Sequence, residues 1–264
     1  MTATPAPTGT GTAAASLEET MVVAAARALA GKRRVFAGIG MPTLAVSLAQ
    51  DTVAPDIEVV YESGVCGAHP TELPATIADA VLITGSEAVL TMPALFGYVL
   101  QAGRIDVGFL GAAQIDRFGN LNSSVIGSWD RPAKRLPGPG GAMEVLANAR
   151  EVFVIMRRHD PRAFVDELDF CTSAGPERVR AAGGVPFGSG VTRVFTGLGT
   201  LSRSGPGEEL TLTEVHRGVT PEQVVAATGW PLRVADTVHE IEPPTDAELH
   251  LLRDEIDPRR VYLR

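Results

Sequence analysis

Residues 57–70 read Ile57-Glu-Val-Val-Tyr-Glu-Ser-Gly-Val-Cys-Gly-Ala-His-Pro70, and this stretch decides both the fold and the candidate site. Its first five residues are a mainly apolar run that predicts a buried strand over 57–61. Glu62 follows directly, and the glycines after it permit a sharp turn and leave room for a ligand near the backbone. A carboxylate placed there is a candidate nucleophile or acid/base. The alternative is a solvated side chain at a strand end.

The residues before this stretch predict an α/β fold. A short strand over 34–37 is followed by a Gly-Ile-Gly-Met-Pro turn over 38–42 and a helix over 43–49. Strand, glycine turn, helix and strand in this order are typical of a parallel sheet with crossover helices. We therefore predict an open twisted mainly parallel sheet flanked by helices.

The rest of the chain supplies further elements. Expected strands are 80–84, 105–110 and 152–156, expected helices are 17–29, 93–102 and 143–149, and 192–215 fits antiparallel pairing. Residues 111–128 are rich in Gly, Asn and Ser and predict a turn within a hairpin. Thr220 and Thr245 each precede residues typical of a helix start. Since no repeat or linker is visible, we predict one domain over 17–264 after a disordered leader over 1–16.

Composition excludes several classes of protein. The 264 residues carry 31 acidic against 23 basic side chains, a net charge of −8, and only 5% are aromatic, which argues against nucleic-acid binding. No uncharged apolar run reaches about eighteen residues, so no transmembrane helix is expected. The first sixteen residues lack the basic start and apolar core of a signal peptide. Cys66 and Cys171 are too few for a disulfide framework, which favours the cytoplasm.

Standard motifs are incomplete. Residues 38–43, Gly-Ile-Gly-Met-Pro-Thr, begin like GxGxxG but lack the third glycine. Cys66 and His69 form a single tight pair, so we expect no metal site. Residues 64–68, Gly-Val-Cys-Gly-Ala, approach a nucleophile elbow with Ala68 in place of the last glycine. A cysteine nucleophile stays as a minor alternative to a small buried Cys66.

Two further segments are rich in polar groups or glycine. Gly138-Pro-Gly-Gly141 precedes an expected helix, and its free backbone N–H groups form either an oxyanion site or a plain turn. The run 111–122 places amide side chains among glycines. A solvent-facing hairpin explains Asn120 and Asn122 but explains less well why Gln114 follows two alanines at the end of a buried strand.

The ordered set of these motifs resembles the β subunits of class I coenzyme A transferases. The motifs are Gly38-Ile-Gly-Met-Pro42, Glu62-Ser-Gly64, Gly111-Ala-Ala-Gln114, Gly119-Asn-Leu-Asn122 and Gly138-Pro-Gly-Gly-Ala142. The similarity continues through 168–175 to 255–258 and so covers nearly all of the chain after the leader. Each motif alone is unspecific, whereas the ordered set is specific. The resemblance implies the CoA-transferase-like fold of the sugar-phosphate isomerase/CoA-transferase superfamily.

The resemblance also implies a mechanism. Glu62 matches the family's catalytic glutamate, which forms an acyl–glutamyl anhydride and then a glutamyl–CoA thioester in a ping-pong reaction. The backbone N–H groups of Gly140, Gly141 and Ala142 become candidates for the oxyanion site. Candidate contacts to CoA or the acyl group are Gly38, Gly40, Ser63, Gly64, Cys66, Gln114, Asn120 and Asn122. Coenzyme A is then a substrate, with no tightly bound cofactor and no metal.

The family further implies a second subunit. This chain has the length of one half of such an enzyme, so we expect an α subunit of similar fold, in a heterodimer or larger αβ assembly. Acyl-CoA and a carboxylate would be the substrates. Some relatives act as acyl-CoA hydrolases or decarboxylases and tend to lose this glutamate, so the presence of Glu62 favours transfer. A hydrolase or decarboxylase, or a non-catalytic β partner of an active α subunit, are the alternatives.

Overall fold

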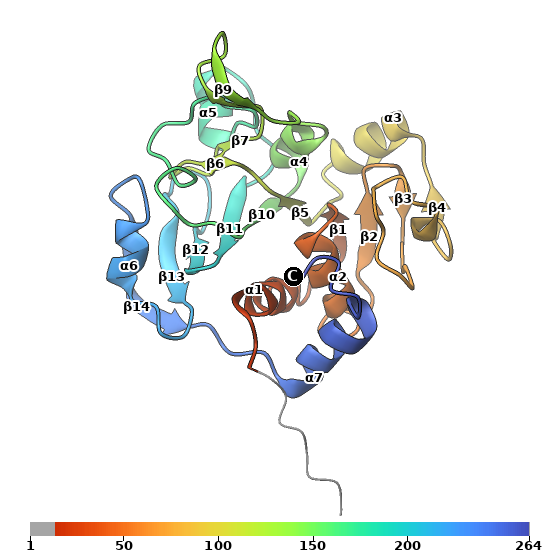
Figure 1. Cartoon of the computed structure of the whole chain (residues 1–264). Coiled ribbons are helices and arrows are strands. Elements are labelled where there is room, and N and C mark those ends of the chain that lie inside the picture. Colours follow the sequence, from red (N-terminus) through yellow and green to blue (C-terminus); the bar gives the residue numbers. More distant parts are fainter. Residues whose placement is uncertain (1–13, 264) are drawn as a thin grey trace, which may run out of the picture.

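A computed structural model describes residues 14–263, and its centre is a ten-stranded sheet (Figure 1). The sheet contains β1 (Arg34–Ala37), β2 (Glu58–Tyr61), β3 (Val65–Cys66), β4 (Ala88–Val89), β5 (Val107–Leu110), β10 (Glu151–Met156), β11 (Val191–Thr196), β12 (Gly199–Ser202), β13 (Thr211–Val215) and β14 (Arg233–Glu240). Two small sheets pair β6 (Gln114–Ile115) with β7 (Leu121–Asn122) and β8 (Val125–Gly127) with β9 (Pro132–Arg135). The helices are α1 (Leu17–Arg27), α2 (Met41–Gln50), α3 (Met92–Ala94), α4 (Ala142–Asn148), α5 (Pro176–Ala181), α6 (Pro221–Ala226) and α7 (Asp246–His250), with a 3₁₀ helix η1 (Ala80–Leu82) and π-helical η2 (Leu95–Leu100) and η3 (Leu251–Ile256).

The strand order is β14-β13-β12-β11-β10-β5-β1-β2-β3-β4. The five strands from β11 to β2 are all parallel, and β13 pairs with β14 in the same sense. The remaining pairs, towards the two edges, are antiparallel. The predicted open, mainly parallel sheet is therefore confirmed, as is the antiparallel pairing expected within 192–215.

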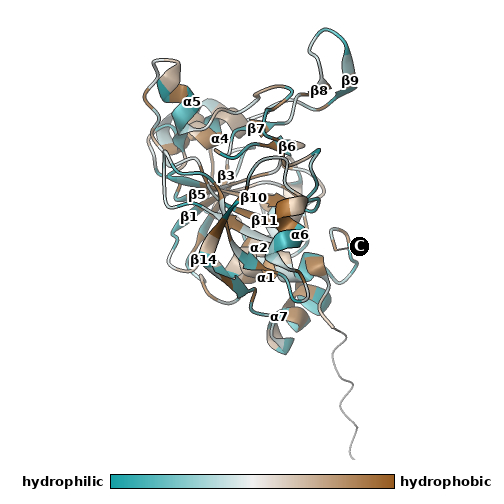
Figure 2. Ribbon diagram, turned by 90° about the vertical axis from the view of Figure 1, so that its left-hand side faces the viewer, coloured by the Kyte–Doolittle hydropathy of each residue, from teal (hydrophilic) through white to brown (hydrophobic). Residues whose placement is uncertain are grey.

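Helices cover both faces of the sheet. In β1, Val35 and Ala37 pack with α1, α2 and η3, whereas Phe36 between them packs on the opposite face with η2 and α4. Successive side chains of a strand point to opposite faces, so buried central strands carry apolar residues at every position. Figure 2 shows this apolar material gathered in the strands at the centre of the molecule.

Three helix starts use the capping-box arrangement. Ser16, Thr220 and Thr245 each accept a hydrogen bond from the third backbone N–H of the helix that follows, and its glutamate or glutamine bonds back to the cap. The starts predicted at Thr220 and Thr245 are thus confirmed. The leader predicted over 1–16 lies mostly outside the described residues. Ala14 accepts a hydrogen bond from a side chain of η3, so the ordered contacts begin before α1.

The strand predicted over 80–84 is wrong. Residues Ala80–Leu82 form η1, which Asp79 caps by accepting a hydrogen bond from the Val81 N–H at 3.2 Å. A short apolar run is compatible with a strand and with a helical turn, and the Asp79 cap stabilises the helical turn here. The helix predicted over 93–102 is present, as α3 continued by η2. Within residues 14–263, no helix has the length and apolarity needed to cross a membrane.

Candidate active site

The candidate site lies at the carboxyl ends of the parallel strands. Gly38, Glu62 and Gly111 directly follow β1, β2 and β5, which are neighbours in the sheet. The chain leaves β1 towards β2 on one side and later returns as β5 on the other. Ligands of open α/β sheets bind in the crevice at such a switch point.

A pocket of about 220 Å³ opens at this crevice. Phe36 of β1, Phe109 of β5 and Val145 of α4 give it apolar walls, and Glu62 and Ser123 supply polar groups. Binding sites usually combine apolar walls with a few placed polar groups.

A larger recess of about 750 Å³ lies around residues 31–34, at the amino ends of the parallel strands. Several of its charged side chains already pair with carboxylates, among them Lys32 with Glu151 and Arg34 with Glu58. We therefore place the candidate site in the smaller pocket.

A tight turn presents Glu62. The Gly64 N–H donates to the Tyr61 carbonyl oxygen at 2.9 Å, which leaves Glu62 and Ser63 at the corner. Gly64 has φ +103, and a Cβ there would lie 2.0 Å from the Leu90 carbonyl oxygen, so only glycine fits. The Ser63 hydroxyl oxygen is buried and has no hydrogen-bond partner among the described residues.

The glycine loop lies against the Glu62 carboxyl group. A Cβ on Gly140 would lie 3.7 and 3.8 Å from the two carboxylate oxygens of Glu62, and one on Gly141 would lie 3.2 Å from its Cδ. Glu62 is half-buried, and no hydrogen bond or ion pair of its carboxylate is found within residues 14–263. The structure thus places these two segments next to each other, and their shared catalytic role stays a prediction.

Two of the three predicted oxyanion donors have free N–H groups. Within residues 14–263, no acceptor is found for the N–H of Gly140 or Gly141. The N–H of Ala142 donates to the Pro139 carbonyl oxygen at 2.8 Å, so this predicted donor is already used and we do not retain it. Ser123 fixes the start of the loop, because its hydroxyl donates to the Gly138 carbonyl oxygen at 3.1 Å.

Gln114 and Asn122 lie outside the pocket lining, in a buried amide network. The Gln114 Oε1 accepts from the Asn122 Nδ2 at 2.7 Å and from the Asp169 N–H at 3.1 Å. The Gln114 Nε2 donates to the Asp169 carboxylate at 3.0 Å. These bonds hold the β6–β7 hairpin against the loop around Asp169, and a contact with substrate stays a prediction for both residues.

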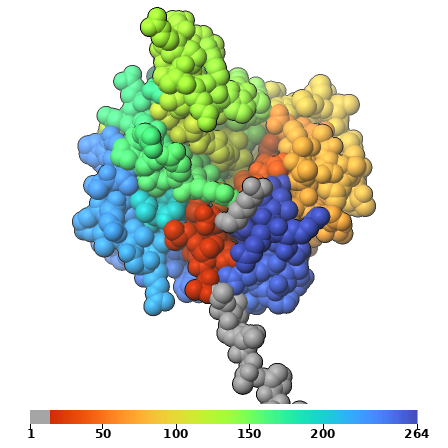
Figure 3. All heavy atoms as spheres, in the orientation of Figure 1, coloured from red at the N-terminus to blue at the C-terminus, as the bar shows by residue number. Residues whose placement is uncertain are grey.

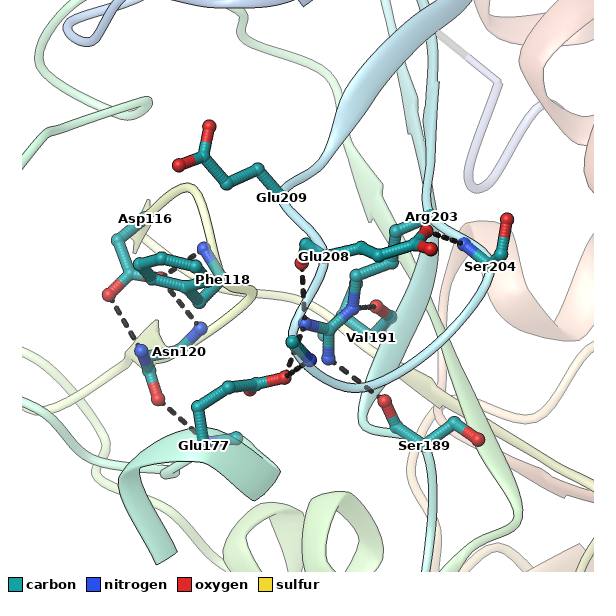
Figure 4. Close-up of polar contacts among 12 residues, drawn as sticks. Asp116, Phe118, Asn120, Glu177, Ser189, Val191, Arg203, Ser204, Glu208 and Glu209 are labelled. Carbon is teal, nitrogen blue, oxygen red and sulfur yellow. Dashed lines mark hydrogen bonds and ion pairs between the residues drawn. The ribbon is translucent and has the colours of Figure 1, made fainter. Parts of the chain in front are cut away.

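Asn120 belongs to a second buried polar cluster, shown in Figure 4. Its side chain donates to the Asp116 carboxylate at 2.7 Å and accepts from the Gly175 N–H at 2.7 Å. Burial raises the pKa of Asp116. Next to it, the fully buried Arg203 donates to Glu177 and to backbone carbonyl oxygens. Asn120 thus has a structural role here, and its contact with a ligand stays a prediction.

Cys66 is 5% exposed and does not line the pocket. Burial raises the pKa of its thiol, which disfavours the thiolate that a nucleophile requires. The structure thus favours the small buried residue over the cysteine nucleophile. Gly40, with φ +106, completes the turn into α2, while Gly38 lines the pocket. Among the described residues, no group of three or more His, Cys, Asp or Glu side chains could hold a metal ion.

Sequence reasoning missed Ser123 and the aromatic walls of the pocket. Phe36 and Phe109 looked like ordinary strand residues, because a pocket wall at a strand end has the same apolar character as the core. Ser123 follows the amide run directly, and its position two residues before β8 carried no separate signal.

The chain is similar to known proteins over most of its length. The family model described as "Coenzyme A transferase" matches residues 18–227. The chain is 46% identical over 241 residues to one subunit of the 3-oxoadipate CoA-transferase of Pseudomonas knackmussii, covering 90% of this chain and 92% of that one. It is 30% identical to one subunit of the glutaconate CoA-transferase of Acidaminococcus fermentans, covering 94% of both chains. The crystal structure of that glutaconate CoA-transferase superposes with a TM-score of 0.85 at 28% identity, over 95% of this chain and 98% of that one. This chain therefore belongs to the coenzyme A transferase family, and its enzymatic activity is the transfer of coenzyme A.

Proposed function

We propose that Glu62 is the nucleophile of a ping-pong transfer of CoA between an acyl-CoA and a carboxylate. One observation carries the proposal: the half-buried Glu62 carboxylate lies in the switch-point pocket against Gly140 and Gly141. A poorly hydrated carboxylate is a better nucleophile than a fully solvated one, and backbone N–H groups beside it can stabilise the oxyanion that its attack creates.

The reaction balances without a cofactor. The Glu62 carboxylate attacks the thioester carbonyl, and the C–S bond breaks to give an acyl–glutamyl anhydride and CoA thiolate. The thiolate attacks the glutamyl carbonyl and releases the first carboxylate, leaving a glutamyl–CoA thioester. The acceptor carboxylate attacks this thioester and expels the thiolate. The thiolate then attacks the acyl carbonyl of the new anhydride, which forms the product acyl-CoA and restores Glu62.

Gly140 and Gly141 supply the oxyanion donors in this scheme. Each attack creates a tetrahedral carbon whose oxygen carries negative charge, and an N–H within hydrogen-bond distance stabilises it. Gly140 has φ +47, which orients its peptide in a way that other residues adopt only at a cost. The loop is also short of side chains, so that the thioester can reach Glu62.

The proposed assembly contains an α subunit. The two relatives above are each named as one subunit of a larger enzyme, and the covalent intermediates must be kept from water, which a pocket open on one side does not do by itself. We propose a dicarboxylic acyl group, because those enzymes are named for 3-oxoadipate and glutaconate. We also propose a cytoplasmic location, where the free thiols of Cys66 and Cys171 stay reduced.

The test uses the complex co-purified with its α subunit. Incubation with acyl-CoA followed by borohydride reduction should modify Glu62, as identified by peptide mass spectrometry. Glu62→Gln should abolish CoA exchange, and Glu62→Asp should lower its rate by about 100-fold, because the shorter side chain withdraws the carboxylate by more than about 1 Å.

Glu72→Gln, which alters an exposed glutamate outside the pocket, serves as the matched control. Normal exchange by the Glu62→Gln complex would contradict the nucleophile assignment. Turnover of acyl-CoA to free acid without any modification at Glu62 would instead support a hydrolase.

A further inference from the structure

The strands β8 and β9 form an arm, residues 125–135, that projects from the body of the molecule. It stands at the top of Figures 1 and 3 and projects equally in the turned view of Figure 2. A two-stranded hairpin is at best marginally stable by itself. The arm therefore needs support at its base, a partner along its length, or both.

The base of the arm is held by the buried amide network. The Asn122 Oδ1 accepts hydrogen bonds from the N–H groups of Ser124 at 3.0 Å and Val125 at 3.3 Å, and its Nδ2 donates to the Val125 carbonyl oxygen at 2.7 Å. The Gly127 N–H donates to the Asp169 carboxylate at 2.9 Å. The amide run that stands out in the sequence thus fixes the direction in which the arm projects.

The tip of the arm carries a preorganised aromatic side chain. Trp129 is 52% exposed and stacks on Phe170, with ring centroids 4.8 Å apart. The Arg135 guanidinium carbon lies 4.3 Å from the Trp129 centroid, and its Nη2 donates to the Trp129 carbonyl oxygen at 2.8 Å. Phe170 and Arg135 thus both contact the ring of Trp129 and hold it in place, while about half of the side chain stays exposed.

This arrangement favours a protein partner over a nucleotide. A base would have to stack on a ring that already contacts Phe170 and Arg135, whereas a pocket on a protein can enclose the exposed part of the side chain. Tryptophan and arginine are enriched among the residues that dominate binding energy at protein interfaces. Because Phe170 and Arg135 already hold Trp129 in place, less conformational entropy is lost on docking.

The charge of the arm is opposite to that of the chain. The arm carries Arg131, Lys134 and Arg135 against a single carboxylate, Asp130, whereas the whole chain has a net charge of −8. No ion pair of these three cations is found within residues 14–263. A partner surface that receives the arm should therefore be acidic around an apolar recess.

We propose that the arm docks on the α subunit, with the exposed part of Trp129 in an apolar recess rimmed by carboxylates. The inference rests on the proposed function in requiring that subunit. The strand β9 leads back into the active-site loop: the Leu136 N–H donates to the Ser124 carbonyl oxygen at 3.0 Å, and Gly138 lines the pocket. The arm is thus connected directly to the loop that presents Gly140.

The test measures association of the two subunits without substrate, by sedimentation of the co-purified complex over a dilution series. Trp129→Ala should weaken association by about 30-fold or more. Arg131→Glu combined with Lys134→Glu should weaken it similarly at low salt and less at high salt. CoA exchange by the variants should recover when the α subunit is saturating.

Matched controls come from outside the arm. Phe187→Ala removes an aromatic that is 57% exposed and lies against Gly103, and Arg33→Glu with Arg217→Glu reverses two exposed cations. Neither should change association by more than about twofold.

Three results would overturn the proposal. One is unchanged association in both arm variants. Another is unchanged association with a raised KM for CoA, which would make the arm a ligand element. The third is loss of self-association by the chain alone, which would make a second copy the occupant. Because association itself is measured without turnover, failure here is distinct from failure of the Glu62 assignment.

Discussion

Gly141→Ala tests the contact between the glycine loop and Glu62. Gly141 has φ −81 and ψ 0, which alanine also adopts, so the backbone itself is not strained. The new Cβ would lie 2.8 Å from the Phe96 Cζ and 3.2 Å from the Glu62 Cδ. Since favourable contacts between carbon atoms begin near about 3.5 Å, the Phe96 ring must withdraw by roughly 0.7 Å and the Glu62 carboxyl by roughly 0.3 Å.

Two effects of different size follow from these displacements. Overpacking against Phe96 should lower the free energy of unfolding by about 1–3 kcal/mol. Displacement of the nucleophile by roughly 0.3 Å should lower kcat/KM for CoA exchange by roughly fourfold, since a shift of about 1 Å costs about 100-fold. Chemical unfolding gives the first quantity, and the initial rate of exchange by the αβ complex gives the second.

A second substitution separates the two effects. Phe96→Leu removes the ring atoms nearest to the new Cβ, so the double variant Gly141→Ala with Phe96→Leu should regain stability relative to the sum of the single changes. It should not regain activity, because the contact with Glu62 remains. Recovery of both the free energy of unfolding and kcat/KM would show that displacement of Phe96, and not direct contact with Glu62, causes the loss of rate. Normal activity of the Gly141→Ala complex would refute the geometry at Glu62.

Two further predictions concern buried charges. Burial lowers the pKa of His159 to about 4 from a usual 6.5. As the pH falls, the unfolded state therefore binds a proton before the folded state does, and the folded protein loses stability between about pH 6.5 and 4. The free energy of unfolding should fall by about 2 kcal/mol at pH 5 through this group. When unfolding is compared at pH 7 and 5, this loss should disappear in His159→Gln and persist in His239→Gln, which alters an exposed histidine. Arg203→Met should lower the free energy of unfolding by about 3–5 kcal/mol, because Glu177 and several buried carbonyl oxygens lose their donor (Figure 4). A loss below about 1 kcal/mol would show that water replaces the guanidinium.

The features that sequence alone predicted are those fixed by a few neighbouring residues. A buried strand that ends in Glu62 followed by Gly64 is such a feature, since the turn needs a positive φ and no Cβ at that position. The capping boxes at Thr220 and Thr245 are also local. By contrast, residues 80–84 carry an apolar run that suits two structures, and the Asp79 side chain selects the helical one.

The amide run shows where local reasoning ends. Gln114 and Asn122 lie among glycines after a buried strand. This pattern is equally typical of a ligand site and of a buried hydrogen-bond network that holds two loops together. The choice depends on Asp169, which is more than forty residues away and accepts hydrogen bonds from Gln114 and from the Gly127 N–H. A carboxylate that bonds both groups can fix the arm only if it stays in place. If the arm docks on the α subunit through Trp129, the amide side chains of residues 111–122 serve to hold the arm in position for that contact.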